Sequence, residues 1–296
     1  MLLAAVAALM FVIQTLCLKK LPEPRSNRAM FGLIAAYSSL IAAGLLLWRA
    51  IEGATPISSE TWLFGILYGA VFTSTMFFYT RAMNTGPLSY SSFYFSVSLM
   101  VPVVASMTLW QEAASPAKLA GLALFLLSFY FIQIYGRQRG NANRRTEKRW
   151  FVYCLLAFLL NGLIPVIAKA HQSMLEGRES AELTLVGFSA ALAFSLLGWI
   201  GASRSSRQTE EPVDRIPFSR GSVMLILGVG LSTGAGNALM NDLSGRLPGA
   251  YLYPFVNGSM IVLLTLASAL VFKEKLTRGG ALGIATGIAA IFAVNL

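Results

Sequence analysis

Long apolar segments alternate with short polar segments along the whole chain. A helix that crosses a bilayer needs about 20 mostly apolar residues, and ten segments have roughly this length and character. They lie at about 2–18, 29–48, 61–80, 88–110, 116–136, 150–169, 182–202, 221–241, 249–272 and 279–295. The pattern therefore predicts an all-α polytopic membrane protein with ten transmembrane helices.

The sequence around Glu112 is repeated around Glu274. ASMTLWQEAASPAKLAG at 105–121 aligns with ASALVFKEKLTRGGALG at 267–283, at a constant offset of 162 residues. Each copy has an apolar run before its acidic turn and another after it. We therefore expect a duplicated chain, whose two halves each contain five helices.

The early helices support the duplication more weakly. Gln14 in the first span and Asn161 in the sixth are matched amides, and Gly69 matches Gly230 at an offset of 161. Chance resemblance between helices rich in Leu, Ala and Gly would explain the match of the first and sixth spans equally well. The duplication therefore depends on the acidic turns.

An odd number of crossings per half places the second half in the inverted orientation, because each crossing changes sides. We expect a first five-helix repeat at 1–136, a basic linker at 137–149 and a second five-helix repeat at 150–296. In secondary transporters built from such inverted repeats, the substrate site lies between the halves.

Charged residues lie mainly in the short connections. The chain is 56% hydrophobic and 12% charged, with a formal net charge of +10. Connections after the odd-numbered spans carry 18 Lys and Arg residues, and the other side carries 5. The positive-inside rule therefore puts the linker in the cytoplasm and both termini outside. The basic charge follows membrane topology, and we expect no nucleic-acid partner.

Polar side chains inside the spans form the candidate site. They are costly in hydrocarbon unless they face another helix or a wet cavity. Thr233, Asn237 and Asn241 recur every four residues and share one helix face. The residues that we expect to bind substrate are Gln14, Tyr94, Asn161, Thr233, Asn237, Asn241, Tyr253 and Asn257.

Each of these residue types also has a purely structural use. Ser and Thr hydroxyls commonly bond within their own helix or join neighbouring helices. Tyrosines also form the aromatic belt at the membrane surface. For Gln14, Asn161, Asn237 and Asn257 a cavity-lining role and a structural role stay equally open, because a buried amide is more costly than a buried hydroxyl.

Glu112 and Glu274 resemble a matched pair of catalytic carboxylates. Each, however, ends an apolar run immediately before a turn and the next helix, and Ser115 and Thr277 suit the N-caps of those helices. Pro116 would then occupy the first helical position. We interpret both acids as turn-fixing residues near the membrane surface and expect no catalytic residues.

No Asp or Glu lies in the middle of any expected span. Proton-coupled carriers commonly use a buried carboxylate or histidine as the relay. This pattern argues against a central carboxylate that exchanges protons for cations. It leaves a uniporter, or coupling through Asp242, Lys169 or the single histidine, His171.

At these motifs the chain resembles the drug/metabolite transporter superfamily, specifically its EamA-like ten-helix members. The resemblance rests on the turn Glu–x–x–Ser/Thr–x5–Gly at 112–121 and at 274–283, supported by P-x-x-x-x-x-R at 22–28. It implies ten helices as inverted five-helix repeats, alternating access, and a cavity surrounded by helices 1, 3, 4, 6, 8 and 9.

Two features depart from this family. Its members often carry tryptophan and asparagine in helix 1, where this chain has Met10, Phe11 and Gln14. Their termini are commonly expected in the cytoplasm, against the charge distribution here. The resemblance therefore does not identify the substrate.

The sequence as a whole predicts a secondary transporter in the plasma (inner) membrane. We expect it to move a small polar or zwitterionic organic metabolite, such as an amino acid or an amine, without a cofactor or a metal. The bilayer and the substrate are the expected partners, and the protein is expected to be a monomer or a homodimer. The alternative is a lipid-handling or non-transporting membrane partner protein; an enzyme is not expected.

Overall fold

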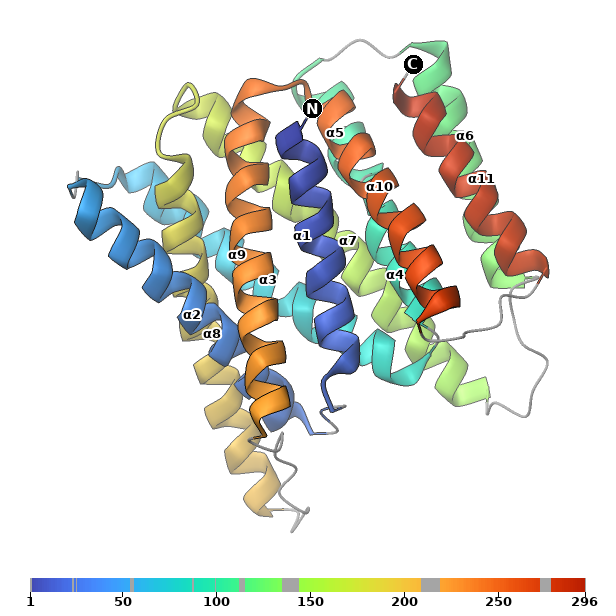
Figure 1. Cartoon of the computed structure of the whole chain (residues 1–296). Helices are drawn as coiled ribbons and strands as arrows, with labels where there is room; N and C mark the ends of the chain where they lie inside the picture. Colours follow the sequence, from blue (N-terminus) through green and yellow to red (C-terminus); the bar gives the residue numbers. More distant parts are fainter. Residues whose placement is uncertain are drawn as a thin grey trace.

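The structure is a computed structural model that describes residues 2–22, 24, 26–53, 56–86, 88–98, 100–111, 115–134, 144–208, 219–271 and 278–295. Over these residues the chain forms helices and no strands, as expected (Figure 1). The helices are α1 (Leu2–Lys20), α2 (Asn27–Glu52), α3 (Ser59–Thr85), α4 (Leu88–Val97), α5 (Met100–Leu109), α6 (Pro116–Ile134), α7 (Arg144–Met174), α8 (Ser180–Gln208), α9 (Arg220–Arg246), α10 (Gly249–Leu270) and α11 (Arg278–Asn295).

Six of the described helices are long and apolar enough to cross a membrane. They are α1, α2, α3, α7, α8 and α9. Large apolar side chains such as Leu47, Met224 and Leu231 are at least 65% exposed on their outer faces. Such exposure suits a lipid environment, because lipid solvates apolar side chains. The chain is therefore a helical membrane protein.

The expected span at 88–110 is divided into α4 and α5. The reason lies at Pro102, which has no backbone N–H to donate to the carbonyl of Ser98 one turn earlier. The Ser98 carbonyl instead accepts the backbone N–H of Val101, at 3.0 Å. Here the apolar pattern alone indicated one long helix, and the proline interrupts it.

Two expected helix starts can be compared with the structure. The helix α6 begins at Pro116, and the Ser115 carbonyl accepts the backbone N–H of Leu119 at 3.2 Å, which confirms the start expected there. The helix α7 begins at Arg144, inside the expected linker, because helix formation outside the bilayer does not require apolar residues. Glu112, Glu274 and Thr277 lie outside the described residues.

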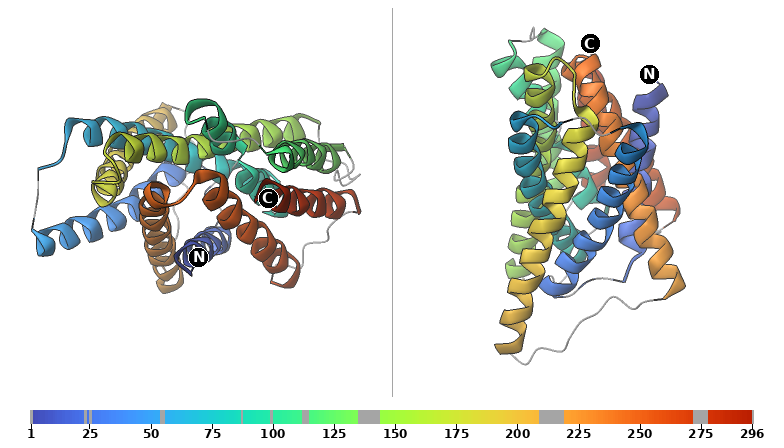
Figure 2. Two further views of the ribbon diagram at one scale, coloured as in Figure 1. Left: turned by 90° about the horizontal axis from the view of Figure 1, so that it is seen from above. Right: turned by 90° about the vertical axis from the view of Figure 1, so that its left-hand side faces the viewer.

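Helices from the two ends of the chain pack against one another throughout the bundle. The pairs in extensive contact are α1 with α9, α2 with α8, α3 with α7 and with α8, and α6 with α11. Figure 2 shows that the helices run along one common direction and that α6 and α11 pair at one end of the molecule. Neither half of the chain could therefore form this bundle alone.

The helices α3 and α8 approach each other closely. A Cβ atom placed on Gly69 would lie 2.5 Å from the carbonyl oxygen of Gly187 and 2.6 Å from Cβ of Ala190. Small residues at such a crossing let two backbones touch, which is a common packing device in membranes. This contact fixes α3, which carries residues of both sites described below.

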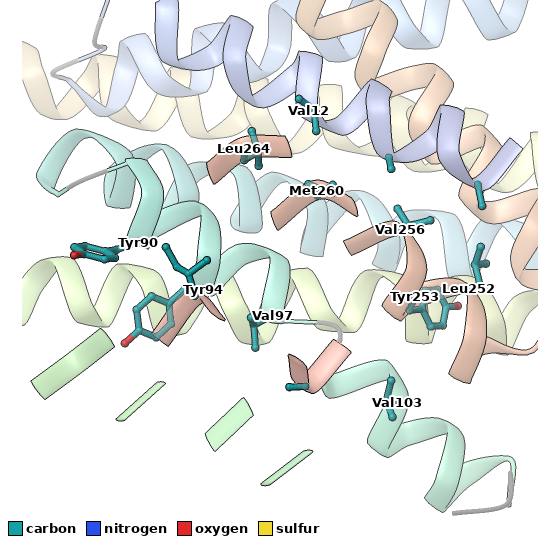
Figure 3. Packing of buried hydrophobic residues seen from close by; sticks show 14 of the residues in the cluster. Val12, Tyr90, Tyr94, Val97, Val103, Leu252, Tyr253, Val256, Met260 and Leu264 are labelled. Atoms are coloured by element: carbon teal, nitrogen blue, oxygen red, sulfur yellow. The ribbon is translucent and has the colours of Figure 1, made fainter. Parts of the chain in front are cut away.

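A buried apolar cluster joins α1, α4, α5 and α10. Its members include Val12, Val97, Val103, Val256 and Met260. Figure 3 shows Val12 of α1 beside Met260 and Leu264 of α10. This cluster closes one side of a cavity at the centre of the bundle.

Candidate functional site: a central cavity and a polar network at its end

A cavity of about 740 Å³, including the space at its mouth, lies between helices of both halves. Residues of α1, α3, α4, α7, α9 and α10 surround it. They are Phe11, Gln14, Phe72, Thr75, Met76, Phe95, Ser98, Asn161, Ile164, Pro165, Ala168, Asn237, Met240, Asn241, Ser244, Tyr253, Val256, Asn257 and Met260.

The cavity brings together most of the residues that the sequence selected for substrate binding. Those that line it are Gln14, Asn161, Asn237, Asn241, Tyr253 and Asn257. Thr233 and Tyr94 do not line it. The expectation that these residues bind substrate stays a prediction, and the structure shows that most of them share one cavity.

Thr233 is fully buried one turn before Asn237 on α9, beyond the end of the cavity. Its backbone carbonyl accepts a hydrogen bond from the Asn237 side chain at 2.9 Å. Its hydroxyl oxygen is buried with no hydrogen-bond partner among the described residues. The i, i+4, i+8 pattern identified the correct face of the helix but not where along it the cavity ends.

Tyr94 packs instead against the first turns of α7. Its ring meets those of Trp150 and Phe151 edge to face, with centroids 6.0 and 6.2 Å apart. Figure 3 shows it pointing away from Val256 and Met260 of α10. Tyr94 is therefore part of the aromatic packing between α4 and α7.

Asn237 is held rigidly in the cavity wall. Its Oδ1 accepts a hydrogen bond from the hydroxyl of Tyr68 at 2.6 Å, and its Nδ2 donates to the Thr233 carbonyl. Asn241, one turn later, donates to the hydroxyl of Thr184 on α8 at 2.9 Å. These bonds fix the polar face of α9 against α3 and α8.

Three other amides present oxygen atoms that accept no hydrogen bond from the described residues. The Asn161 side chain donates to Ser98 at 2.7 Å, Asn257 donates to the Tyr253 carbonyl at 3.0 Å, and Gln14 lies 3.8 Å from the sulfur of Met76. In each case the nitrogen is the engaged atom. The side-chain oxygens of Gln14, Asn161 and Asn257 receive no hydrogen bond from the described residues, so they are available as acceptors.

None of the described residues that line the cavity carries a formal charge. Among the described residues, a buried cation follows the lining residue Ala168: Lys169, which is 8% exposed. Its Nζ donates to Ser106 at 3.0 Å and lies 4.8 Å from the ring centre of Trp110. Lys169 is thus directed toward α5, beside the cavity.

A second polar cluster joins the start of α3 to the end of α7. It consists of Ser58, Thr61, His171, Gln172 and Glu179, and we refer to it as the His171 network. The Thr61 hydroxyl lies 2.7 Å from Nε2 of His171 and donates to Glu179 Oε2 at 2.6 Å. Gln172 Nε2 lies 2.9 Å from Nδ1 of His171. Thr61 and His171 are both fully buried.

Glu179 closes this network from the loop between α7 and α8. Its backbone φ is 56°, in the left-handed region that costs side chains other than glycine about 1–2 kcal/mol. Ser58 donates to Glu179 Oε2 through both its hydroxyl and its backbone N–H, at 2.8 and 3.2 Å. The strained backbone is therefore held by the bonds that its side chain makes.

These bonds also set the acidity of Glu179. Burial raises the pKa of the carboxyl, but hydrogen bonds from Thr61 and Ser58 and the nearby His171 outweigh burial and lower the pKa below its ordinary value. Glu179 is consequently a carboxylate at neutral pH.

The His171 network differs from a nucleophilic triad. In a triad the carboxylate bonds the imidazole nitrogen that faces away from the nucleophile. Here Glu179 bonds the Thr61 hydroxyl, and Gln172 occupies the other ring nitrogen. The described residues also contain no group of three His, Cys, Asp or Glu side chains that could hold a metal ion. The arrangement is suited to holding and passing a proton.

Two parts of this region were not predicted from the sequence. Tyr68, which anchors Asn237, was not selected, although a hydroxyl-bearing ring inside an apolar helix is a usable signal. The His171 network joins residues 110 and 118 positions apart. Only His171 itself was a candidate, because no spacing pattern along one helix connects such distant positions.

Comparisons with known proteins show the fold only. No family model matches the chain, and no curated protein matches it. In total, 27 chains of known structure match. One, described only as the crystal structure of a protein, has a TM-score of 0.65 at 17% identity and covers 98% of this chain and 98% of its own. The helical fold is therefore shared over the full length with a solved structure.

Proposed function

We propose that this protein is a secondary transporter of the EamA-like drug/metabolite type, which moves a small polar or zwitterionic metabolite by alternating access. The observation that carries this proposal is the central cavity, which lies between helices of both halves and has five neutral amides in a mainly apolar wall. A binding site between two halves of a bundle is the arrangement that alternating access requires.

The contacts between helices support ten spans in two inverted five-helix repeats. When α4 and α5 are counted as one span, the helices α1, α2 and α3 of the first repeat correspond to α7, α8 and α9 of the second. The contact of α3 with α7 then corresponds to the contact of α9 with α1, and both contacts are extensive. In the same way, the contact of α3 with α8 corresponds to that of α9 with α2. Gly69 faces α8, and its repeat equivalent, Gly230, faces Tyr37 and Leu40 of α2.

The cavity chemistry supports the proposed substrate class. The acceptor oxygens of Gln14, Asn161 and Asn257 suit the N–H groups of an amine or amino acid. The rings of Phe11 and Phe72 in the wall can also face a cationic group, which aromatic faces attract. An uncharged wall favours a solute with no large net charge, because burying an uncompensated ion is expensive.

The charge distribution supports the orientation proposed for the plasma membrane. Both chain ends lie on one face of the bundle (Figure 1). The end of α1 and the start of α9, which carry Lys20 and Arg220, lie at the other face (Figure 1). By the positive-inside rule, these basic helix ends favour an orientation with the chain ends outside.

Uptake into proteoliposomes tests the proposal. A panel of labelled amino acids and amines would be presented to the wild type and to Asn257→Leu, which removes an acceptor oxygen at nearly constant volume. We expect uptake of at least one compound by the wild type. We expect the variant to lower that uptake by about tenfold, the loss that follows when one good hydrogen bond to a charged group is removed.

Asn84→Ala is the matched control. Asn84 also makes one side-chain bond to a backbone carbonyl, that of Pro24, but lies at the end of α3 away from the cavity. Its uptake should equal that of the wild type. No uptake of any panel compound by folded wild-type protein would contradict the proposal and favour the lipid-handling alternative. Equal loss in both variants would contradict the cavity as the site.

A further inference from the structure

The hydrogen bonds around His171 determine where its ring protons are held. The Thr61 hydroxyl has one proton and donates it to the Glu179 carboxylate at 2.6 Å. Its oxygen can then only accept from the ring nitrogen 2.7 Å away, so Nε2 of His171 carries a proton. On the other side of the ring, the Gln172 amide nitrogen donates to Nδ1 at 2.9 Å. In this arrangement the imidazole is neutral.

Gln172 leaves one buried group unused in that arrangement. Its Oε1 has no hydrogen-bond partner among the described residues, although the side chain is only 2% exposed. Rotating the amide by half a turn would bring Oε1 to Nδ1, which would then have to carry a proton of its own. The same side chain can therefore hold the neutral ring or the imidazolium, and the unused oxygen is the acceptor that an added proton needs.

We propose that His171 is a proton-binding site and that its protonation drives substrate movement through the central cavity. This inference rests on the transport function proposed above and makes the protein a proton-coupled carrier. Glu179 supplies the balancing negative charge through the Thr61 hydroxyl, from the partly exposed end of the network in the loop between α7 and α8. Figure 1 shows this loop on the same face as the chain ends.

Loading the ring transfers one proton. In the neutral ring Nε2 carries a proton bonded to Thr61 Oγ1, and Nδ1 has the free lone pair. A hydronium ion gives up one proton, which forms a new N–H bond at Nδ1 and leaves water; the rotated Gln172 amide accepts that N–H through Oε1. The net change is one proton gained, which leaves an imidazolium whose Nε2–H is bonded through the Thr61 hydroxyl to the Glu179 carboxylate.

Glu179 is the charged group that this network connects to His171. On the remaining side the ring meets Phe64 of α3 edge to face, 5.8 Å away. The other charged groups on neighbouring elements form bonds away from His171 or are exposed. Those with bonds elsewhere are Glu60 on α3, Lys169 on α7, Arg178 in the loop, Glu182 on α8 with Arg49 on α2, and Asp242 with Arg246 on α9. Glu176 in the loop is exposed.

Two contacts connect the His171 network to the cavity. His171 follows the lining residue Ala168 by one turn on α7, beyond Pro165, which interrupts the backbone bonding of that helix. The Gln172 amide faces α9, since a Cβ atom on Gly245 would lie 3.1 Å from Oε1. The residue before Gly245, Ser244, lines the cavity. Rotation of the amide therefore changes a contact with a cavity wall.

The first test needs no substrate, because His171 is the single histidine of the chain. The full protein, purified with a histidine-free tag and labelled with ¹⁵N-histidine, would be titrated by NMR in lipid nanodiscs. We expect the neutral ring to be protonated at Nε2 and to become an imidazolium within about pH 5–8, where histidines normally titrate. A ring that stays neutral throughout this range would overturn the proposal.

The second test measures coupling, with the panel compound that the wild type takes up. An inward proton gradient should accelerate wild-type uptake, and His171→Gln and Thr61→Val should each reduce this acceleration by about tenfold, a typical coupling between two sites. Exchange at equal pH should continue in both variants. Thr73→Val is the control, because its buried hydroxyl on the same helix bonds only the Ala191 carbonyl.

The outcomes separate this inference from the transport function. Undiminished gradient acceleration in His171→Gln would overturn the proton site and leave transport intact. If no compound is transported by the wild type, the transport function fails, and the histidine titration still decides whether His171 binds a proton. If a variant does not fold, the titration of the wild-type protein decides alone.

Discussion

The central cavity and the His171 network use polar groups in opposite ways. In the cavity, neutral amides donate through their nitrogens and keep the oxygens of Gln14, Asn161 and Asn257 available. In the His171 network a carboxylate, a hydroxyl and an imidazole are bonded to one another. The cavity can thus receive a solute without burying a fixed charge, while the Glu179 carboxylate stays partly exposed at the end of the bundle.

This separation has a physical cause. A fixed charge in the middle of a bilayer is expensive unless it is paired or hydrated. Amide dipoles are less costly and can still orient a solute. Placing the acid at the end of the bundle, where Glu179 is partly exposed, avoids most of the cost of burying it. The two regions are linked through α3 and α7, which contribute residues to both.

The largest expected effect would come from separating α3 from α8. Gly69→Ala places a methyl group 2.5 Å from the Gly187 carbonyl oxygen, so the helices must move apart. We expect the free energy of unfolding to fall by about 1–3 kcal/mol. Thermal unfolding in detergent, followed by tryptophan fluorescence, would measure this.

Gly44→Ala is the matched control, because no atom lies within 4 Å of a Cβ at that position on α2. Alanine favours helix over glycine, so this variant should be as stable as the wild type or more so, by at most about 1 kcal/mol. Equal unfolding temperatures for both variants would show that the α3–α8 contact is not tight.

A smaller effect is expected from Tyr68→Phe, which acts on the cavity alone. It removes the hydroxyl that donates to Asn237 Oδ1 at 2.6 Å and leaves a buried acceptor without its donor. We expect a loss of about 1–2 kcal/mol of stability and weaker uptake. The measurement is unfolding in detergent, with proteoliposome uptake in parallel.

Tyr37→Phe provides the comparison for this change. The Tyr37 hydroxyl is buried with no hydrogen-bond partner among the described residues. Its removal should leave stability unchanged or slightly raised, because an unsatisfied polar group is lost. If Tyr37→Phe were as destabilising as Tyr68→Phe, the bond to Asn237 would not be the cause.

The smallest effect concerns pH and the His171 network. The pKa of Glu179 is lowered in the folded protein from its ordinary value of 4.5. Its carboxylate therefore stabilises the fold above that value, and this contribution is lost as the pH falls through the lowered pKa. We expect the wild type to be more stable than Glu179→Gln at pH 7 and this difference to shrink as the pH falls from 5 toward 3.

Unfolding temperatures of both proteins over this pH range would provide the test. Glu60→Gln is the control, since it makes the same change at the start of α3, and its difference from the wild type should vary less. A gap between wild type and Glu179→Gln that stays constant with pH would contradict the assigned bonds.

The sequence by itself determined the helical membrane class and six polar residues of the cavity wall. The run lengths predicted helices, and the four-residue spacing of Asn237 and Asn241 placed them on one face. Both predictions depend on local periodicity, which the backbone of an isolated helix imposes. The same reasoning predicted one helix at 88–110, where the structure has two, because the effect of Pro102 on the backbone was not taken into account.

The tertiary structure alone decided which polar residues meet. Thr233 repeats the spacing of Asn237 and yet lies beyond the cavity, and Tyr94 packs against α7, because the depth and direction of a side chain depend on neighbouring helices. The bonds of Thr61 with His171 and Glu179 join three segments that are distant in the chain. Such contacts arise only when helices pack, so no pattern within one segment contains them.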